Sequence, residues 1–573
     1  MASNGCATSL KTVVVLGGAY GGARAAQLIA AGLPDGWRIV LIDRNSHVNH
    51  VYILPRLAVL AGHEHKAFVP YDNVFNLPDS DSAKHDSGKY TFIQAHIHSL
   101  SANCVTLSRY GQTTEETLHF DYAVYALGSH LPSPLNLWHA APDGKPAGHG
   151  VHAYGGTKAE GIAWLRGKQR TIEEAGSVLV VGGGALGIQF ATDIAAVHPG
   201  KRVTLLHSRA RLLPRFDSAM HTETPILIDL VLVAVLQALE SANVDVILGE
   251  RLDLVSSSSP GRNTVCTTTG RVIQADLVVR LVLILFRSPR IIIADPGART
   301  QLLCTGQRPN TELLAALDAR TVDPGSALVH VLRTMQLAPI PPSPSPPLPE
   351  LVPAPAPDVD VDVLEHSPAP EDELAAALAQ IALLDDDASS SPPSSPLSPS
   401  SPSSPDTSDS AADAEPDTEA TSPYPHVFVI GDAADAFGAI PAGHNAYFQA
   451  EVAARNLLRL VAAEGESADE RVELERYTPG PPAIKVSLGL PLPTPAPPPF
   501  PPFPTSPPSL PLPNANLRPP QKKNVYQVNG VVGIGKEARD DLNAAAIWPY
   551  FGCPVTEGEA DAQEGAGEGG MYR

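Results

Sequence analysis

The chain has 573 residues, a formal net charge of −21, 43% apolar residues and 58 prolines. Its length exceeds what one hydrophobic core organises and predicts about two to four domains. The acidic balance argues against a nucleic-acid-binding protein, because such a protein needs a basic face. The proline content indicates that part of the chain does not fold.

The cysteines are scattered and form neither a C-x-x-C nor a C-x4-C pair; they are Cys6, Cys104, Cys266, Cys304 and Cys553. This spacing argues against a zinc ribbon and against the redox disulfide of a disulfide reductase, so we expect no metal site. Few unpaired cysteines and no secretory segment predict a reducing, cytoplasmic setting. No apolar run reaches the roughly 18 residues of a membrane-spanning helix, so we expect at most peripheral membrane contact.

The first predicted unit alternates short strands with a helix. A β-branched strand at 12–16 runs into glycines, and a helix from Gly21 to Gly32 leads to a strand at 38–43. Further strands are predicted at 90–97, 103–108 and 120–128. This order is typical of a Rossmann-like nucleotide-binding unit.

The same pattern returns about 165 residues later, at 177–208, and predicts a second Rossmann-like unit. Its turn carries a complete G-x-G-x-x-G at Gly182, Gly184 and Gly187. The first glycine permits the tight turn, the second lets the backbone approach a pyrophosphate, and the third lets the helix pack closely. We expect nucleotide binding here, with a merely tight strand–helix turn as the alternative.

The first loop, GGAYGG at 17–22, departs from this pattern because its middle position is Ala19. Alanine adds one methyl group where the backbone approaches a pyrophosphate, and the flanking glycines leave room to adjust. We therefore expect nucleotide binding to survive.

The residue that closes the second strand of each unit contacts the ribose. In the first unit it is Asp43, which suits ribose hydroxyls and repels a 2′-phosphate. In the second unit the equivalent place reads His207-Ser208-Arg209, with no carboxylate and a guanidinium close by. NADPH is therefore at least as plausible as NADH, unless Arg209 and Arg211 are only solvated.

The segment VFVIGDAADA at 427–436 contains a third strand, which ends in Gly431-Asp432. A helix is predicted after it, from about 442 to 460. An aspartate at such a place can bind a polyol chain, or it can cap the helix. Between 337 and 423 the chain is rich in proline, serine and acidic residues, and we expect a disordered linker. A second proline-rich stretch at 490–520 reads as a spacer, with SH3-type binding as the alternative.

Taken in order, GGAYGG, Asp43, YALGS (125–129), the second glycine loop, CTGQRPN (304–310) and IGDAADA resemble the flavoproteins with two dinucleotide-binding domains. The set looks most like the apoptosis-inducing-factor-like branch, the mitochondrion-associated, ferroptosis-suppressor type of NAD(P)H:quinone reductase. The resemblance implies an α/β fold with two Rossmann-like three-layer domains and a small C-terminal α+β region. It also implies FAD in the first domain and NADH or NADPH in the second.

The resemblance implies the following division of the chain: 10–150 and 424–465 (FAD-binding), 151–336 (NAD(P)H-binding), 337–423 (linker) and 466–573 (C-terminal region). It implies FAD contacts at Gly17, Gly18, Ala19, Tyr20, Gly21, Gly22, Asp43, Arg56, Lys66, Ile97, Gly128, Gly431 and Asp432. It implies NAD(P)H contacts at Gly182, Gly184, Gly187, Ser208 and Arg209. Within these sets, Arg56 and Lys66 would lie near the flavin, and Asp432 on its ribityl chain.

Three segments depart from the family pattern because they fall inside expected elements: 224–235, 280–301 and 490–520. Our hypothesis is that some of them are retained non-coding sequence or errors of the gene assignment.

The expected function is an FAD-dependent NAD(P)H oxidoreductase that reduces a quinone-type acceptor. Two alternatives stay open, a reductase for a ferredoxin or rubredoxin and a weakly catalytic NAD(P)H-sensing protein related to apoptosis. No catalytic acid or base is identified, since hydride transfer between stacked rings depends mostly on geometry. We expect a cytoplasmic protein, in contact at most with the surface of mitochondria or lipid droplets.

Overall fold

The computed structural model describes residues 10–75, 88–130, 155–213, 235–236, 239–240, 242–253, 264–282, 301–305, 308–341, 422–464, 472–480, 484–490, 523–528, 531–536 and 540–554. Residues 1–340 and 421–573 belong to one compact unit, and the description below concerns that unit. Most of the expected linker and the segments at 224–235 and 490–520 lie outside the described residues, as does most of 280–301.

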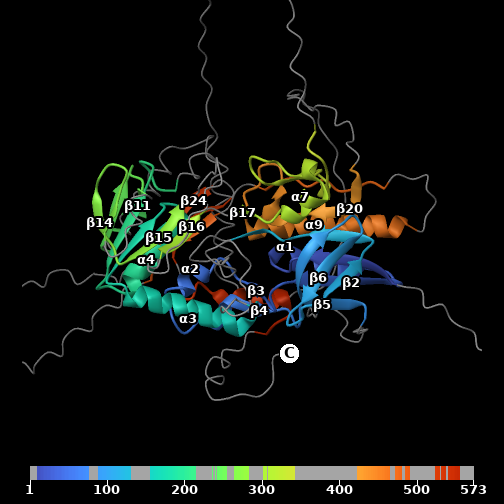
Figure 1. Cartoon of the computed structure of the whole chain (residues 1–573), viewed down its shortest axis with the longest axis horizontal. Helices are drawn as coiled ribbons and strands as arrows, with labels where there is room; N and C mark the ends of the chain where they lie inside the picture. Colours follow the sequence, from blue (N-terminus) through green and yellow to red (C-terminus); the bar gives the residue numbers. More distant parts are fainter. Residues whose placement is uncertain are drawn as a thin grey trace, which may run out of the picture. The chain divides into compact units, whose positions relative to one another are not determined.

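Within the described residues, the first sheet has eight strands in the order β19-β20-β8-β1-β2-β5-β6-β7 (Figure 1). Its parallel strands are β1 (Lys11–Leu16), β2 (Trp37–Asp43), β5 (Tyr90–Leu100), β8 (Tyr122–Tyr125) and β20 (Tyr424–Val429). Its antiparallel strands are β6 (Cys104–Arg109), β7 (Glu115–His119) and β19 (Gln336–Leu337). Because β20 pairs with β8, the segment that contains β20 completes the first Rossmann-like domain.

The core of this domain lies between the sheet and two long helices, α1 (Tyr20–Gly32) and α9 (Gly443–Ala463). The β-branched run of β1 is fully buried, as is usual for parallel strands covered on both faces. Glycine sets the close approach of α1 to α9. A methyl group on Gly21 would lie 2.8 Å from the carbonyl oxygen of Ala446, and one on Gly32 would lie 2.5 Å from Leu458 Cδ1.

The second sheet is entirely parallel among the described residues, in the order β12-β11-β10-β15-β16. The strands are β10 (Ser177–Val181), β11 (Arg202–His207), β12 (Val244–Leu248), β15 (Leu277–Val282) and β16 (Gln301–Thr305). In chain order this is 3-2-1-4-5, the order of the first five strands of a Rossmann sheet, with α4 (Ala185–Val197) between β10 and β11. The two segments that flank 283–300 were expected to form one interrupted strand. They are instead two neighbouring strands, β15 and β16.

The C-terminal region contains the antiparallel sheet β22 (Ile484–Ser487), β23 (Lys523–Val528) and β24 (Val531–Lys536), followed by the 3-10 helix η5 (Ala544–Phe551). Shorter elements of the unit include α2 (Leu54–Leu57), η1 (Glu64–Ala67), β3 (His47–Asn49), β4 (Phe68–Pro70), β9 (Ser129–His130), β13 (Thr264–Cys266), β14 (Val272–Gln274), β17 (Arg308–Pro309), α7 (Glu312–Leu317), η3 (Ala319–Thr321), β18 (Val329–His330), η4 (Gly431–Ala433) and β21 (Ala434–Asp435). The described residues continue past β19 to Pro341, so 337–341, the start of the expected linker, belong to the described part of the chain.

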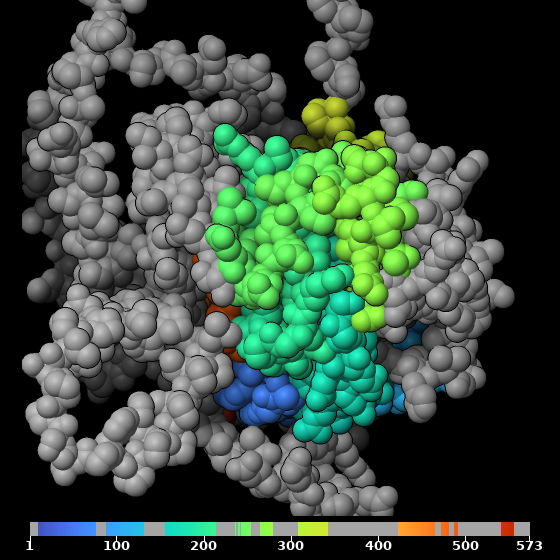
Figure 2. Space-filling model, turned by 90° about the vertical axis from the view of Figure 1, so that its left-hand side faces the viewer, coloured from blue at the N-terminus to red at the C-terminus, as the bar shows by residue number. Residues whose placement is uncertain are grey.

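A second apolar cluster joins the two Rossmann-like domains. Leu54 and Leu57 of α2 pack in it with Phe190 of α4 and with Leu165 of α3 (Lys158–Glu174). Figure 2 shows this side of the molecule, where the blue surface of the N-terminal chain borders the teal surface of the second domain. Among the described residues, no helix has both the length and the apolar character that a bilayer crossing requires.

Candidate cofactor site

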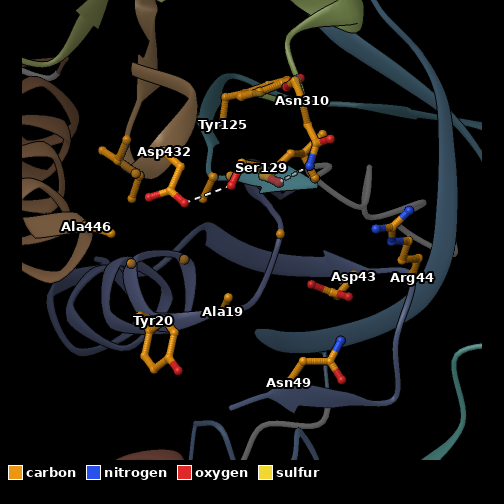
Figure 3. A pocket seen from close by; sticks show the side chains of 18 of the residues that line it. Ala19, Tyr20, Asp43, Arg44, Asn49, Tyr125, Ser129, Asn310, Asp432 and Ala446 are labelled. Carbon is orange, nitrogen blue, oxygen red and sulfur yellow. Dashed lines mark hydrogen bonds between the residues drawn. The ribbon is translucent and has the colours of Figure 1, made fainter. Parts of the chain in front are cut away.

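A cavity of about 530 Å³ lies at the carboxyl ends of β1, β2 and β8, where α1 begins (Figure 3). Open parallel sheets bind their ligands in this position. Ten of the residues expected to contact FAD line it: Gly17, Ala19, Tyr20, Gly21, Gly22, Asp43, Ile97, Gly128, Gly431 and Asp432. The structure thus brings together residues from both ends of the sequence.

The first glycine loop is a cradle that larger residues would fill. Gly17 has φ +94°, and a methyl group on it would lie 2.5 Å from the carbonyl oxygen of Ala126. A methyl group on Gly22 would overlap the carbonyl oxygen of Gly17. Ala19 has φ −68°, an ordinary value for alanine, so this departure from the glycine pattern strains nothing. The loop leads into the N-terminus of α1, where backbone N–H groups favour an anion.

Asp43, the last residue of β2, is held in place before any ligand arrives. Its Oδ2 accepts hydrogen bonds from the Gly18 N–H at 2.8 Å and from the Tyr71 hydroxyl at 3.2 Å. Its Oδ1 accepts from the Asn45 backbone N–H at 2.8 Å. Gly18 therefore lies directly behind the cavity wall and orients the carboxylate, which still has lone pairs for ribose hydroxyls.

Asp432, in η4, reaches the cavity from the other part of the domain (Figure 3). Its Oδ2 accepts a hydrogen bond from the Ser129 hydroxyl at 2.9 Å. Burial raises the pKa of Asp432 above its ordinary value, and the Ser129 hydrogen bond opposes that rise. The carboxylate is thus a partly desolvated acceptor that suits a hydroxylated chain.

Three residues of this site escaped the prediction from sequence. Ser129 and Asn310 lie in the motifs YALGS and CTGQRPN, which indicated the fold but not these side-chain roles. Asn310 donates to the Leu127 carbonyl at 2.7 Å, and its Oδ1 has no hydrogen-bond partner among the described residues. Tyr71 closes the cavity behind Gly18, and only its place after an apolar strand could have signalled it.

Two expected flavin contacts, Arg56 and Lys66, lie outside the residues that line this cavity. The Arg56 side chain is fully buried and donates to Asp193 Oδ2 at 2.8 Å, to the Ser487 hydroxyl at 2.6 Å and to the Asp540 carbonyl at 2.8 Å. Arg56 therefore ties α2 to α4 and to the C-terminal region.

Lys66 forms an ion pair with Asp541 at 2.6 Å. Burial is the largest single influence and would raise the pKa of Asp541, but the hydrogen bond and the charge of Lys66, together with the Asn543 N–H and the charge of His63, lower the pKa overall. Lys66 thus joins η1 to the C-terminal region.

The second glycine loop joins β10 to α4. Gly182 has φ +127°, Gly184 caps the N-terminus of α4, and Gly187 is buried in its first turn. The Gly183 N–H donates to His207 Nδ1 at 3.0 Å. Ser208 and Arg209 follow on the surface.

The residues of the first cavity fit FAD. A glycine cradle at a helix N-terminus accepts a pyrophosphate, and carboxylates on two different elements accept the hydroxyl groups that flank it. The second loop offers the same backbone chemistry to a second dinucleotide.

Comparisons with known proteins agree with this arrangement. The family described as pyridine nucleotide-disulphide oxidoreductase matches residues 11–282. The chain is 35% identical over 485 residues to Fe-regulated protein 8 of Mycosarcoma maydis, an alignment that covers 84% of this chain and 87% of that protein.

Two further relatives match a shorter part of the chain. It is 27% identical over 276 residues to Ferroptosis suppressor protein 1 of Xenopus tropicalis, and 25% identical over 288 residues to Apoptosis-inducing factor homolog B of Dictyostelium discoideum. Each alignment covers 47% of this chain and 62% of the relative, so the chain spans less than two thirds of these two proteins.

Proposed function

The chain belongs to the apoptosis-inducing-factor-like family of flavin-dependent NAD(P)H oxidoreductases, and on this premise we propose that it passes electrons from NAD(P)H to a quinone-type acceptor. FAD and NAD(P)H are the cofactors of this family, and FAD when bound accepts a hydride and returns two electrons to an oxidant. The observation that carries the proposal is the cavity lined by the first glycine loop, Asp43 and Asp432.

Each part of the cavity has a task in binding. The glycine loop and the N-terminus of α1 hold the pyrophosphate. Asp43 orients the adenosine ribose, because its own position is fixed by Gly18 and Tyr71. Asp432, supported by Ser129, accepts from the ribityl hydroxyls. The second glycine loop binds the nicotinamide nucleotide.

A quinone fits as acceptor better than a disulfide does. The sequence holds no closely spaced cysteine pair. In the part of the chain that the structure describes, Cys104, Cys266 and Cys553 are free thiols. A two-electron flavoprotein without an active-site disulfide suits a small oxidant, and a quinone takes up two electrons and two protons.

The test is anaerobic stopped-flow reduction of the flavin by NADH and by NADPH, followed by mixing with an acceptor. Fast bleaching by a nicotinamide nucleotide and fast reoxidation by a water-soluble quinone are expected. Reoxidation only by ferredoxin or rubredoxin would favour the iron-protein reductase. A bound flavin that neither nucleotide reduces would favour an NAD(P)H-sensing protein and contradict the proposal.

A further inference from the structure

In each glycine loop the backbone N–H of one glycine donates a hydrogen bond to a side chain, but the accepting side chain differs between the two loops. In the first domain the Gly18 N–H donates to the Asp43 carboxylate at 2.8 Å, and in the second the Gly183 N–H donates to His207 Nδ1 at 3.0 Å. Asp43 is the last residue of β2, and His207 is the last residue of β11. An imidazole therefore occupies the place of the carboxylate.

His207 performs this task as a neutral ring. His207 is only 8% exposed, and its Nδ1 needs a free lone pair to accept the hydrogen bond from the Gly183 N–H. The proton of the neutral ring is then on Nε2, which has no hydrogen-bond partner among the described residues. Burial lowers the pKa of His207, and the charge of Arg209 lowers it further.

The segment after His207 is fastened to the same glycine. The Leu213 N–H donates to the Gly183 carbonyl at 2.8 Å, and Leu213 adopts φ +51°, a value that leucine rarely takes. A methyl group on Gly183 would lie 2.7 Å from His207 Cγ and would overlap Leu212. The backbone that carries the exposed residues Arg209 and Arg211 is therefore held beside the loop at both ends.

Glu250, the acidic residue that follows the neighbouring strand β12, does not supply a free negative charge beside His207. Glu250 follows β12, and its backbone N–H donates to the His207 carbonyl at 3.2 Å. Its carboxylate pairs with Arg271 at 2.8 Å and accepts hydrogen bonds from Thr267 and Thr269, each at 2.8 Å. Its charge is thus compensated by residues of the β13–β14 hairpin.

We propose that His207 determines the nucleotide preference of the second domain, because it fixes the glycine loop without the negative charge that a carboxylate would bring. A 2′-phosphorylated nicotinamide nucleotide, NADPH, is accepted next to Arg209 and Arg211. In the first domain Asp43 supplies the same hydrogen bond but repels such a phosphate. This inference rests on the proposed function in one respect, that the second domain binds NAD(P)H.

The experiment measures dissociation constants of NADP+ and NAD+ for the full-length, FAD-loaded chain by isothermal titration calorimetry, without turnover. His207→Asp keeps an acceptor for the Gly183 N–H and adds a negative charge. It should raise the ratio of the NADP+ to the NAD+ dissociation constant by at least about tenfold. His207→Asn, a neutral acceptor, should change this ratio by less than about threefold.

Arg202→Ser is the control for overall charge, because Arg202 is exposed at the opposite end of β11. It should leave the ratio unchanged. If His207→Asp fails to retain FAD, His207→Glu brings the same charge from the same strand end and is measured in its place.

Equal ratios in the Asp and Asn variants would overturn the role of His207. The role of His207 would also be overturned if neither His207→Asp nor His207→Glu changed the ratio of the NADP+ to the NAD+ dissociation constant. Failure of the wild-type chain to bind either nucleotide would instead overturn the proposed function of the second domain, so the two failures are distinct.

Discussion

At the scale of single residues, substitution of Asp43 tests whether a carboxylate held in place by Gly18 and Tyr71 contributes to FAD binding. Asp43→Ala leaves the Gly18 N–H and the Tyr71 hydroxyl without their acceptor and removes from the cavity wall the carboxylate that we propose contacts the ribose. We expect FAD affinity to fall by about 10- to 100-fold, which corresponds to roughly 1–3 kcal/mol for an unsatisfied buried group. The measurement is the dissociation constant of FAD for the apoprotein.

The control for Asp43 is Asp35→Ala. Asp35 is fully exposed and lies 3.9 Å from Lys89, so its loss should leave FAD affinity unchanged. An Asp43→Ala protein that holds FAD as tightly as the Asp35 variant would show that the carboxylate does not contribute.

The glycine loop gives a second prediction at this scale. Gly22→Ala places a methyl group on the carbonyl oxygen of Gly17, so we expect loss of bound flavin from the purified protein. Ala19→Gly should retain full flavin, because Ala19 already adopts an ordinary conformation. The ratio of flavin to protein absorbance measures both. Equal flavin content in the two variants would contradict the role of the loop.

The residues that could be predicted from sequence share one property, a local signal. Asp43 closes a β-branched strand at a fixed distance from a glycine turn, and Asp432 follows another such strand. The partners of Arg56 could not be predicted, because Asp193 and Ser487 are far away in the sequence and meet it only through packing. The family resemblance therefore singled out Arg56 in the sequence, but only the structure shows which residues it contacts.

At the scale of elements, the succession of strands and helices could be predicted from the sequence, whereas the strands on either side of 283–300 could not. The repeated strand–turn–helix–strand pattern predicted two Rossmann-like units, and the structure has two such sheets, the first mixed and the second parallel among the described residues. The pair β15 and β16 was not predicted, because an apolar segment between them looked like an interruption of one strand. Periodicity does not tell whether two short apolar runs form one strand or two neighbours.

The β3–β4 element carries a prediction for pH dependence. Burial lowers the pKa of His47 to about 3, and that of His50, next to the element, to about 4. Between these values and about 6.5 the unfolded chain binds protons that the folded chain does not, so stability is complete above pH 6.5 and falls as pH decreases. Each histidine contributes up to about 1.4 kcal/mol per pH unit in this window.

His47→Gln should flatten this dependence by about one proton. The measurement is urea unfolding, followed by tryptophan fluorescence, of both proteins between pH 5 and pH 7. The same slope in wild type and variant would contradict the neutral, buried state of His47.

At the scale of the whole molecule, Arg56 joins the FAD-binding domain to the second domain and to the C-terminal region. Its partner Asp193 is 0% exposed, so Arg56→Met leaves a buried carboxylate without a compensating charge. We expect the free energy of unfolding to fall by roughly 3–5 kcal/mol. The double variant Arg56→Met/Asp193→Leu should recover much of this loss, because it removes both charges and keeps an apolar contact.

The pair Arg320–Asp318 provides the control, because its arginine is 73% exposed, and Arg320→Met should change stability far less. Flavin content of the Arg56 variant decides between its two possible roles. If the free energy of unfolding falls while the folded variant binds FAD as tightly as the wild type, Arg56 holds the domains together. FAD affinity that falls while stability is retained would mean that Arg56 contacts the flavin, as the family resemblance implies. In that case occupation of the cofactor site would be coupled to the contact between the two domains, because Arg56 also pairs with Asp193 of α4.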